Sequence, residues 1–258
     1  MRRRSGAVYL SPPDPPGVRM YNLLLSLAAG LAVAIAIRLG GFGWVAVIVP
    51  GVLMAAIAYV ALNLRAQKRL SAIVEGAVAD AQARRFDRAI QQAKGAFSLG
   101  PWLFGAEAAV AALIGQFLWW KGDQEAAVPY LERASAGQWP ARVMLAVARW
   151  KKRDLAAMQK VFEDTLKGRA NRKQGLVWCA YAWFLDKESR HDEAVRVLAR
   201  AVETNPTDEK LKTALQSLQN GKKLKIGKLY MEWYNFGVEA PPQVMPPGFR
   251  PGRRATYR

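Results

Sequence analysis

Two long uncharged segments near the start of the chain constrain the fold more than any other feature. They cover residues 20–37, which read MYNLLLSLAAGLAVAIAI, and residues 44–64, which read WVAVIVPGVLMAAIAYVALNL. A helix rises about 1.5 Å per residue, so each segment is long enough to cross a hydrocarbon layer of roughly 30 Å. The link between them contains the glycine-rich stretch GGFG. We therefore expect a transmembrane helical hairpin over residues 20–65.

Small residues recur at four-residue spacing on both apolar segments. They are Ser26, Gly30 and Ala34 on the first segment and Gly51 and Ala55 on the second. In lipid, faces of small residues let two helices approach closely, so we expect the two spans to pack on these faces. A proline inside the second segment, Pro50, predicts a kink there.

Two other interpretations of the apolar segments carry less weight. The sequence Ala34-Ile35-Ala36 resembles a signal-peptide cleavage site, but a second apolar segment follows it and the first lies far from the start. The buried hairpin of a soluble protein is the other alternative, and the basic residues that flank both segments argue against it.

Basic residues next to the spans predict their orientation. Arg2, Arg3, Arg4 and Arg19 precede the first span and Arg65, Lys68 and Arg69 follow the second, whereas the link holds only Arg38. Lysine and arginine accumulate on the cytoplasmic side of a membrane. We therefore expect two spans in the inner (cytoplasmic) membrane, with the N- and C-termini in the cytoplasm.

The whole chain is strongly basic and holds a single cysteine. Its 38 Lys and Arg against 20 Asp and Glu give a net charge of +18 over 258 residues. Apart from the two ends, the basic residues alternate with acidic ones, a pattern that suits anionic lipid headgroups and makes nucleic-acid binding less favoured. One cysteine, Cys179, excludes a disulfide within the chain and fits a reducing compartment.

Residues 175–208 carry the pattern of small and bulky side chains that is typical of a pair of crossing helices. Small residues let two helices cross closely, bulky ones fill the space between them, and a proline ends the unit because it cannot continue a helix. These positions are occupied, in order, by Trp178, Ala182, Leu185, Ala194, Leu198, Ala201 and Pro206. The pattern resembles a tetratricopeptide (TPR) repeat.

Weaker copies of the same pattern precede this unit. They cover residues 70–103, 108–141 and 139–174. Their second helices would open near Ala89, Ala127 and Met158, with Ala194 in the last unit, at spacings of 38, 31 and 36 residues. These spacings lie near the 34-residue period of TPR repeats.

The resemblance implies an all-α chain in four parts. A basic, proline-rich arm at 1–19 and the hairpin precede a TPR-like α-solenoid over residues 66–221. Residues 209–220 would form its capping helix, ended by Gly221. A basic, aromatic and proline-rich tail with irregular structure follows at 222–258.

No catalytic or metal-binding constellation emerges from the sequence. His191 is the only histidine and occupies a slot between two expected helices, where a packing role is favoured over a catalytic one. One histidine and one cysteine do not make a zinc site, and no phosphate-binding glycine loop is present. We therefore expect no enzyme, no metal and no cofactor.

The TPR resemblance also implies a partner-binding surface, because the first helices of such repeats line a concave groove. Carried onto this sequence, the groove-facing positions are Gln116, Trp119, Trp120, Trp150, Lys151, Trp183 and Lys187. Several tryptophans on one wall suit an apolar or proline-rich extended segment of a partner. Burial of some of these rings between repeats is the competing interpretation.

An aromatic stretch in the tail invites a second hypothesis. Trp233, Tyr234 and Phe236 are too apolar to stay in water and are tethered beside the expected groove, which raises their effective concentration. We expect them to dock on the repeats.

These expectations favour a membrane-anchored scaffold or adaptor that recruits a protein partner at the cytoplasmic face. A two-span anchor followed by TPR units looks like the layout of several bacterial envelope-assembly and heme-operon-associated membrane TPR proteins. The alternative is a subunit of an envelope transport or assembly complex in which the hairpin itself is functional. The absence of charged residues inside both spans gives little support to an ion path through them.

Overall fold

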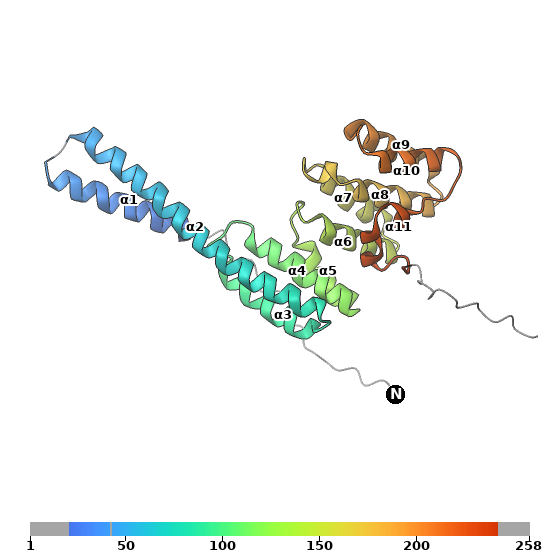
Figure 1. Ribbon diagram of the computed structural model, residues 1–258, viewed down its shortest axis with the longest axis horizontal. Helices are drawn as coiled ribbons and strands as arrows, with labels where there is room; N and C mark the ends of the chain where they lie inside the picture. Colours follow the sequence, from blue (N-terminus) through green and yellow to red (C-terminus); the bar gives the residue numbers. More distant parts are fainter. Residues whose placement is uncertain (1–20, 42, 242–258) are drawn as a thin grey trace, which may run out of the picture. The chain divides into compact units, whose positions relative to one another are not determined.

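The computed structural model describes residues 21–41 and 43–241, and the regular structure in these ranges is entirely helical (Figure 1). The all-α prediction is therefore confirmed. The expected arm at 1–19 and the proline-rich end of the tail from residue 242 lie outside the described residues.

Helices α1 (Tyr21–Leu39) and α2 (Trp44–Gln82) pack side by side and form the predicted apolar pair (Figure 1). Both are long and apolar enough to cross a membrane. Their contact uses the small residues: a Cβ added to Gly30 would lie 2.5 Å from the Gly51 carbonyl oxygen and 2.7 Å from the Ala55 Cβ. Because backbone atoms meet there, only glycine fits at residue 30, and the predicted close approach of small faces is confirmed.

Helix α2 does not end where the apolar segment ends. It runs without a break from Trp44 through Pro50 to Gln82, so its second half extends beyond α1 and packs against α3 (Phe86–Gly95). The boundary expected at residue 65 falls inside this helix. No linker separates the apolar pair from the helices that follow, because the chain keeps one helical backbone across the change from apolar to polar residues.

Two compact units divide the chain, Met1–Val177 and Trp178–Arg258. The elements after α3 are η1 (Ala96–Leu99), α4 (Ala106–Lys121), α5 (Gln124–Glu132), α6 (Trp139–Lys151), α7 (Leu155–Leu166), η2 (Asn171–Lys173), α8 (Gly175–Lys187), α9 (His191–Thr204), α10 (Glu209–Gln219), α11 (Ile226–Leu229) and η3 (Met231–Phe236). In the first unit, α3 packs on α4, α4 pairs with α5, α6 pairs with α7, and both α4 and α5 also pack on α6. In the second unit, α9 packs on α10.

One turn geometry recurs at four places in the chain. At each, a residue in the left-handed conformation ends one helix and the next residue caps the following helix. The left-handed residues are Arg84, Gly122, Arg153 and Ser189. Each donates its N–H to the carbonyl three residues earlier, and the residue after it donates to the carbonyl five residues before its own position, at N···O distances of 2.8–3.1 Å. This pair of bonds is the Schellman motif, which satisfies carbonyls at the end of the first helix.

A buried residue follows each of these turns by five positions. Ala89, Ala127 and Ala194 are 0% exposed and Met158 is 1% exposed. These are the four positions expected to open the second helices, and each is the fourth residue of its helix, in α3, α5, α7 and α9. The helices α2–α3, α4–α5 and α6–α7 pack on one another as pairs. Helices α4 and α5 cross closely, because a Cβ on Gly115 would lie 2.7 Å from the Leu131 Cδ2 atom.

The helix expected at residues 209–220 also forms, as α10, and it ends as predicted. The side chain of Asp208 accepts hydrogen bonds from the N–H groups of Lys210 and Leu211 at the start of α10. At its end, Gly221 is left-handed, its N–H donates to the Leu218 carbonyl, and the N–H of Lys222 donates to the Ser217 carbonyl. The tail then forms two short helices, α11 and η3, within the range that was expected to be irregular.

Candidate functional site

The residues expected to line a groove do not form one uniformly open surface. Trp119 and Trp183 are 3% and 5% exposed, whereas the Trp120 side chain is 40% exposed. Gln116 and Trp150 are half-buried, and Lys151 and Lys187 are exposed. A buried ring cannot contact a partner in this conformation, so the competing interpretation of core packing holds for Trp119 and Trp183. Binding of a partner by the other positions stays a prediction.

Trp119 is covered from the next helix pair. The Lys151 ammonium of α6 lies 5.3 Å from the centre of its ring and donates a hydrogen bond of 2.9 Å to the Gln124 side chain of α5. Desolvation by the surrounding protein lowers the pKa of Lys151. The lysine therefore joins three helices across Trp119 and is not free to serve as an anchor for an acidic partner.

Trp183 is covered by the tail of its own unit. The Trp233 ring packs edge-on against Trp183 with centroids 5.3 Å apart and lies 6.1 Å from the ring of Phe184. Trp233 is 0% exposed and Phe236 is 2% exposed. The Lys187 ammonium lies 4.9 Å from the centre of the Trp183 ring. The position expected to receive a partner is thus occupied by the chain's own aromatic segment.

Polar contacts hold this aromatic segment in place. The Trp233 Nε1–H donates to Glu239 at 2.8 Å, and the Tyr230 hydroxyl donates to the Asp208 carboxylate at 3.4 Å. Burial raises the pKa of Tyr230, with smaller contributions from Cys179 and Asp208, so its hydroxyl stays protonated and can donate. Tyr234 is half-buried and lies so close to Gly227 that a Cβ there would collide with its ring.

Gln116 borders a cavity of about 210 Å³ between the second half of α2 and α4. A second glutamine, Gln138, also lines it, and the rest of the wall is formed by Leu70, Val74, Ala109, Val110 and Leu113. The cavity is mostly apolar with two amide groups at its margin. Such a composition suits an apolar side chain of a peptide whose backbone hydrogen-bonds to the amides.

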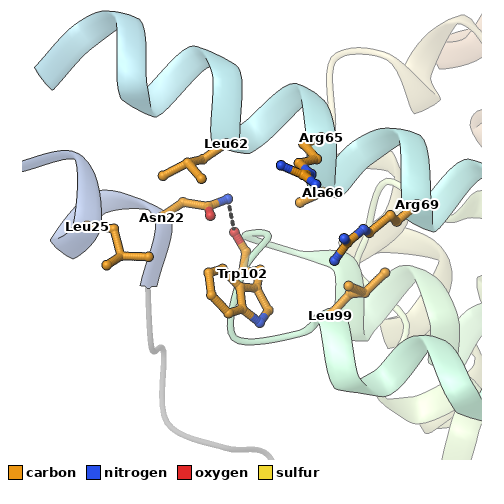
Figure 2. Close-up of a pocket in the computed structure, with 8 residues that line it drawn as sticks. All are labelled: Asn22, Leu25, Leu62, Arg65, Ala66, Arg69, Leu99 and Trp102. Atoms are coloured by element: carbon orange, nitrogen blue, oxygen red, sulfur yellow. Dashed lines mark hydrogen bonds between the residues drawn. The ribbon is translucent and has the colours of Figure 1, made fainter. Parts of the chain in front are cut away.

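A second cavity, of about 250 Å³, lies where α1 and α2 meet the loop that precedes α4 (Figure 2). It is lined by Asn22, Leu25, Leu62, Arg65, Ala66, Arg69, Leu99 and Trp102. The loop holds the start of α1: the Tyr21 N–H donates to the Pro101 carbonyl at 3.2 Å, and the Asn22 Nδ2 donates to the Trp102 carbonyl at 2.8 Å. The Tyr21 and Trp102 rings meet edge to face, 5.4 Å apart.

Sequence reasoning did not find this cavity. Its signal in the sequence is the pair Arg65 and Arg69, one helical turn apart directly after the apolar segment, together with Asn22, a polar residue at the start of the other segment. The contact with the loop at residues 100–105 could not be inferred, because 80 residues separate Asn22 from Trp102.

The surroundings of Cys179 and His191 favour structural roles for both side chains. Cys179 is 0% exposed, and burial raises the pKa of its thiol above its usual range, which keeps it in the unreactive thiol form. The His191 Nδ1 lies 2.8 Å from the Asp186 carboxylate across the α8–α9 turn, and this hydrogen bond raises the pKa of His191. Within residues 21–41 and 43–241, no three His, Cys, Asp or Glu side chains lie close enough to hold a metal ion.

Comparison of the chain with protein-family models, with curated proteins and with solved structures finds no match in any of the three. Its function is therefore argued from its own residues.

Proposed function

We propose that this chain is a membrane-anchored scaffold whose TPR-like helix pairs recruit a protein partner at the cytoplasmic face of the inner membrane. The observation that carries the proposal is the turn geometry repeated at Arg84, Gly122, Arg153 and Ser189, each followed by a buried residue five positions later. Repetition of one helix-pair design is the basis of solenoid proteins, which use extended surfaces to bind other proteins.

The anchor and the first helix pair share one helix, which gives the scaffold its geometry. Because α2 continues from the apolar pair into the first repeat, the recruiting surface would be held at a fixed distance from the bilayer. Exposed leucines, valines and isoleucines around α1 and the first half of α2 support insertion, since such residues are costly in water. The basic residues at the cytoplasmic ends favour the proposed orientation.

In this proposal the partner binds the first unit. The exposed Trp120, the half-buried Trp150 and the apolar cavity beside Gln116 are accessible there, whereas the Trp183 position in the second unit is occupied by Trp233. Exposed tryptophans are frequent anchors of protein interfaces.

Orientation can be tested with single cysteines, because the native thiol is buried. In a Cys179→Ala background, Leu39→Cys and Lys223→Cys would be probed in intact spheroplasts with a membrane-impermeant maleimide. Residue 39 is 84% exposed at the link between the helices, and residue 223 is exposed after α10. In intact spheroplasts we expect labelling of residue 39 and not of residue 223. Residue 223 should be labelled only after permeabilisation. Labelling of residue 223 in intact spheroplasts would contradict the topology.

Recruitment can be tested with a photo-crosslinking amino acid placed at residue 120 in the living cell. The matched control is residue 160, an exposed lysine of α7 that is not among the proposed surface residues. A scaffold should give a discrete crosslinked protein from residue 120 that is lost with Trp150→Ala and does not appear from residue 160. Equal products from both positions would contradict a specific surface.

A hairpin exchange separates this function from its alternative. A scaffold should keep the residue-120 crosslink when residues 20–64 are replaced by an unrelated two-span anchor. Loss of the crosslink with normal membrane insertion would favour a transport or assembly subunit in which the hairpin itself is functional.

A further inference from the structure

The cavity in Figure 2 lies at the level where the apolar segments end. Arg65 is the first charged residue after the apolar part of α2, and α1 starts at Tyr21 beside it. The rings of Tyr21 and Trp102, which meet at this level, are of the kind that prefers a membrane–water interface. In an inserted protein, the phosphate layer of the cytoplasmic leaflet would therefore surround this cavity.

Asn22 presents an unsatisfied acceptor to the cavity. Its side chain is 3% exposed and lines the cavity wall. The Nδ2 group donates to the Trp102 carbonyl, which can only accept, so the orientation of the amide is determined. Among the described residues, the Oδ1 atom of Asn22 is the buried side-chain polar atom left without a hydrogen-bond partner. Burying an acceptor without a partner is costly, so a donor group from a ligand is the missing component.

Arg65 and Arg69 present hydrogen-bond donors to the cavity, whereas Asn22 presents an acceptor. They lie one turn apart on α2 and both line the cavity, and the Arg69 side chain is directed toward Leu99 and the Trp102 loop (Figure 2). In the part of the chain that the structure describes, neither forms an ion pair with a carboxylate. Two guanidinium groups with free donors at one site favour a phosphate, which accepts from both.

The other side of the cavity is apolar. Leu25 of α1 and Leu62 of α2 line it, one turn closer to the centre of the apolar pair than Asn22 and Arg65. A ligand that fills the cavity therefore carries an anionic phosphate beside a hydrogen-bond donor at one end and hydrocarbon at the other.

We propose that this cavity binds one anionic glycerophospholipid with a hydroxyl-bearing headgroup, such as phosphatidylglycerol. The phosphate accepts hydrogen bonds from Arg65 and Arg69, the headgroup hydroxyl donates to the Oδ1 atom of Asn22, and the acyl chains lie along Leu25 and Leu62. The inference rests on the membrane insertion in the proposed function but not on the protein partner. A soluble phosphate ester would match the arginines and leave the apolar wall unfilled.

Native mass spectrometry of the full-length protein in mild detergent tests the site. The probes are phosphatidylglycerol, phosphatidylcholine and phosphatidylmethanol with identical acyl chains, and glycerol phosphate as the soluble competitor. Wild-type protein should retain one phosphatidylglycerol, at least about tenfold more tightly than phosphatidylcholine. Phosphatidylmethanol has the same charge without the hydroxyl and should bind about fivefold more weakly, the size of one neutral hydrogen bond.

Charge-matched variants separate a site from a basic surface. Arg65→Gln and Arg69→Gln change exposed side chains, so the fold should persist, and each should weaken phosphatidylglycerol retention about tenfold or more. Lys68→Gln removes the same charge from the same helix at a position that does not line the cavity, and it should leave retention unchanged.

Three results would overturn the assignment. If Lys68→Gln and Arg65→Gln lowered phosphatidylglycerol retention equally, the lipid would be held by diffuse charge attraction. If equimolar glycerol phosphate displaced the phosphatidylglycerol, no acyl chain would be bound in the cavity. Equal retention of phosphatidylglycerol and phosphatidylmethanol would remove Asn22 from the site. Extraction of the protein from membranes by alkaline carbonate, in contrast, would contradict the membrane insertion itself and is scored separately.

Discussion

The apolar residues of the α1–α2 pair and those of the later helix pairs are chemically alike but face opposite surroundings. Leu24, Leu31 and Val52 are 61%, 62% and 63% exposed, whereas Ile114 and Leu118 in α4 are fully buried. Within the first unit, the helices from α4 to α7 pack on one another and cover their apolar side chains. The first pair uses its small residues for contact and leaves its large ones exposed, an arrangement that suits the proposed membrane insertion.

The two regions therefore respond to different substitutions. In the helix pairs, removal of a buried ring should be costly and an outward change should be tolerated. In the apolar pair, an outward change to a charge should be costly, because the surroundings and not the chain provide the apolar contact. The following predictions test this contrast.

The largest effect is expected where the tail closes the second unit. Trp233→Ala removes a fully buried ring that packs on Trp183 and Phe184 and should lower the free energy of unfolding by about 4 kcal/mol. The control Met231→Ala changes a neighbouring side chain that is 69% exposed and should cost little. Thermal unfolding of the full-length protein in detergent, with hydrogen exchange of α8, gives the measurement. Truncation after Gly221 should act in the same direction, and an unchanged melting temperature would contradict a stabilising role for the tail.

A charge on the outward face of the apolar pair should act next. Val52→Lys places an ammonium at a position of α2 that is 63% exposed, and in the lipid of the proposed function this costs about 3 kcal/mol. The control Met231→Lys makes the same change at an outward position of the second unit and should cost less than about 0.5 kcal/mol. Membrane integration, measured by alkaline extraction, should fall for the first variant only. Equal integration of the two variants would remove the distinction between the regions.

A smaller, stabilising effect is expected at the repeated turns. Arg153 has φ 62°, a conformation that glycine adopts without strain, as Gly122 does at the equivalent turn. Arg153→Gly should therefore raise stability by up to about 1 kcal/mol. The adjacent Lys152 has φ −83°, so Lys152→Gly relieves no backbone strain. This substitution should lower stability, because glycine loses more conformational entropy on folding. Unfolding midpoints of both variants check the sign, and destabilisation by both would contradict equivalence of the turns.

Local patterns in the sequence predicted a large part of this fold. The positions of Ala127 and Ala194, the close approach at Gly30 and the end of α10 at Gly221 depend on neighbours within one or two turns of a helix pair. Where small residues must meet backbone, few arrangements are possible, and the pattern identifies the contact. The packing of α1 on α2 and of α4 on α5 could be predicted for this reason.

The exposure of individual aromatic rings could not be predicted in the same way. Trp119 is covered by Lys151 and Trp183 by Trp233, and both covering residues are distant in sequence. The cavity beside Arg65 and Arg69 depends likewise on the contact of Asn22 with the Trp102 loop. Nor did the pattern predict the ion pair of 2.8 Å between Asp80 and Arg85 at the turn that ends α2.

The smallest predicted effect concerns pH and the α8–α9 turn. The hydrogen bond from Asp186 raises the pKa of His191 in the folded chain, with a further contribution from Asp192. The protonated ring is therefore stabilised by folding, and this stabilisation is fully present below the unfolded pKa of about 6.5 and is lost as pH rises through the folded pKa. The side chain is 43% exposed, so the effect should be weaker than those above.

The measurement is the difference in unfolding midpoint between the wild type and His191→Gln at about pH 5.5 and about pH 8.5, because other titrating groups cancel in the difference. The wild type should be the more stable protein at the lower pH, and the two should converge at the higher one. Asp186→Asn should reduce this pH dependence, since it removes the carboxylate that contributes most to favouring the charged ring. A difference that stays constant with pH would show that His191 acts through packing alone, as the apolar residues of the same helix pair do.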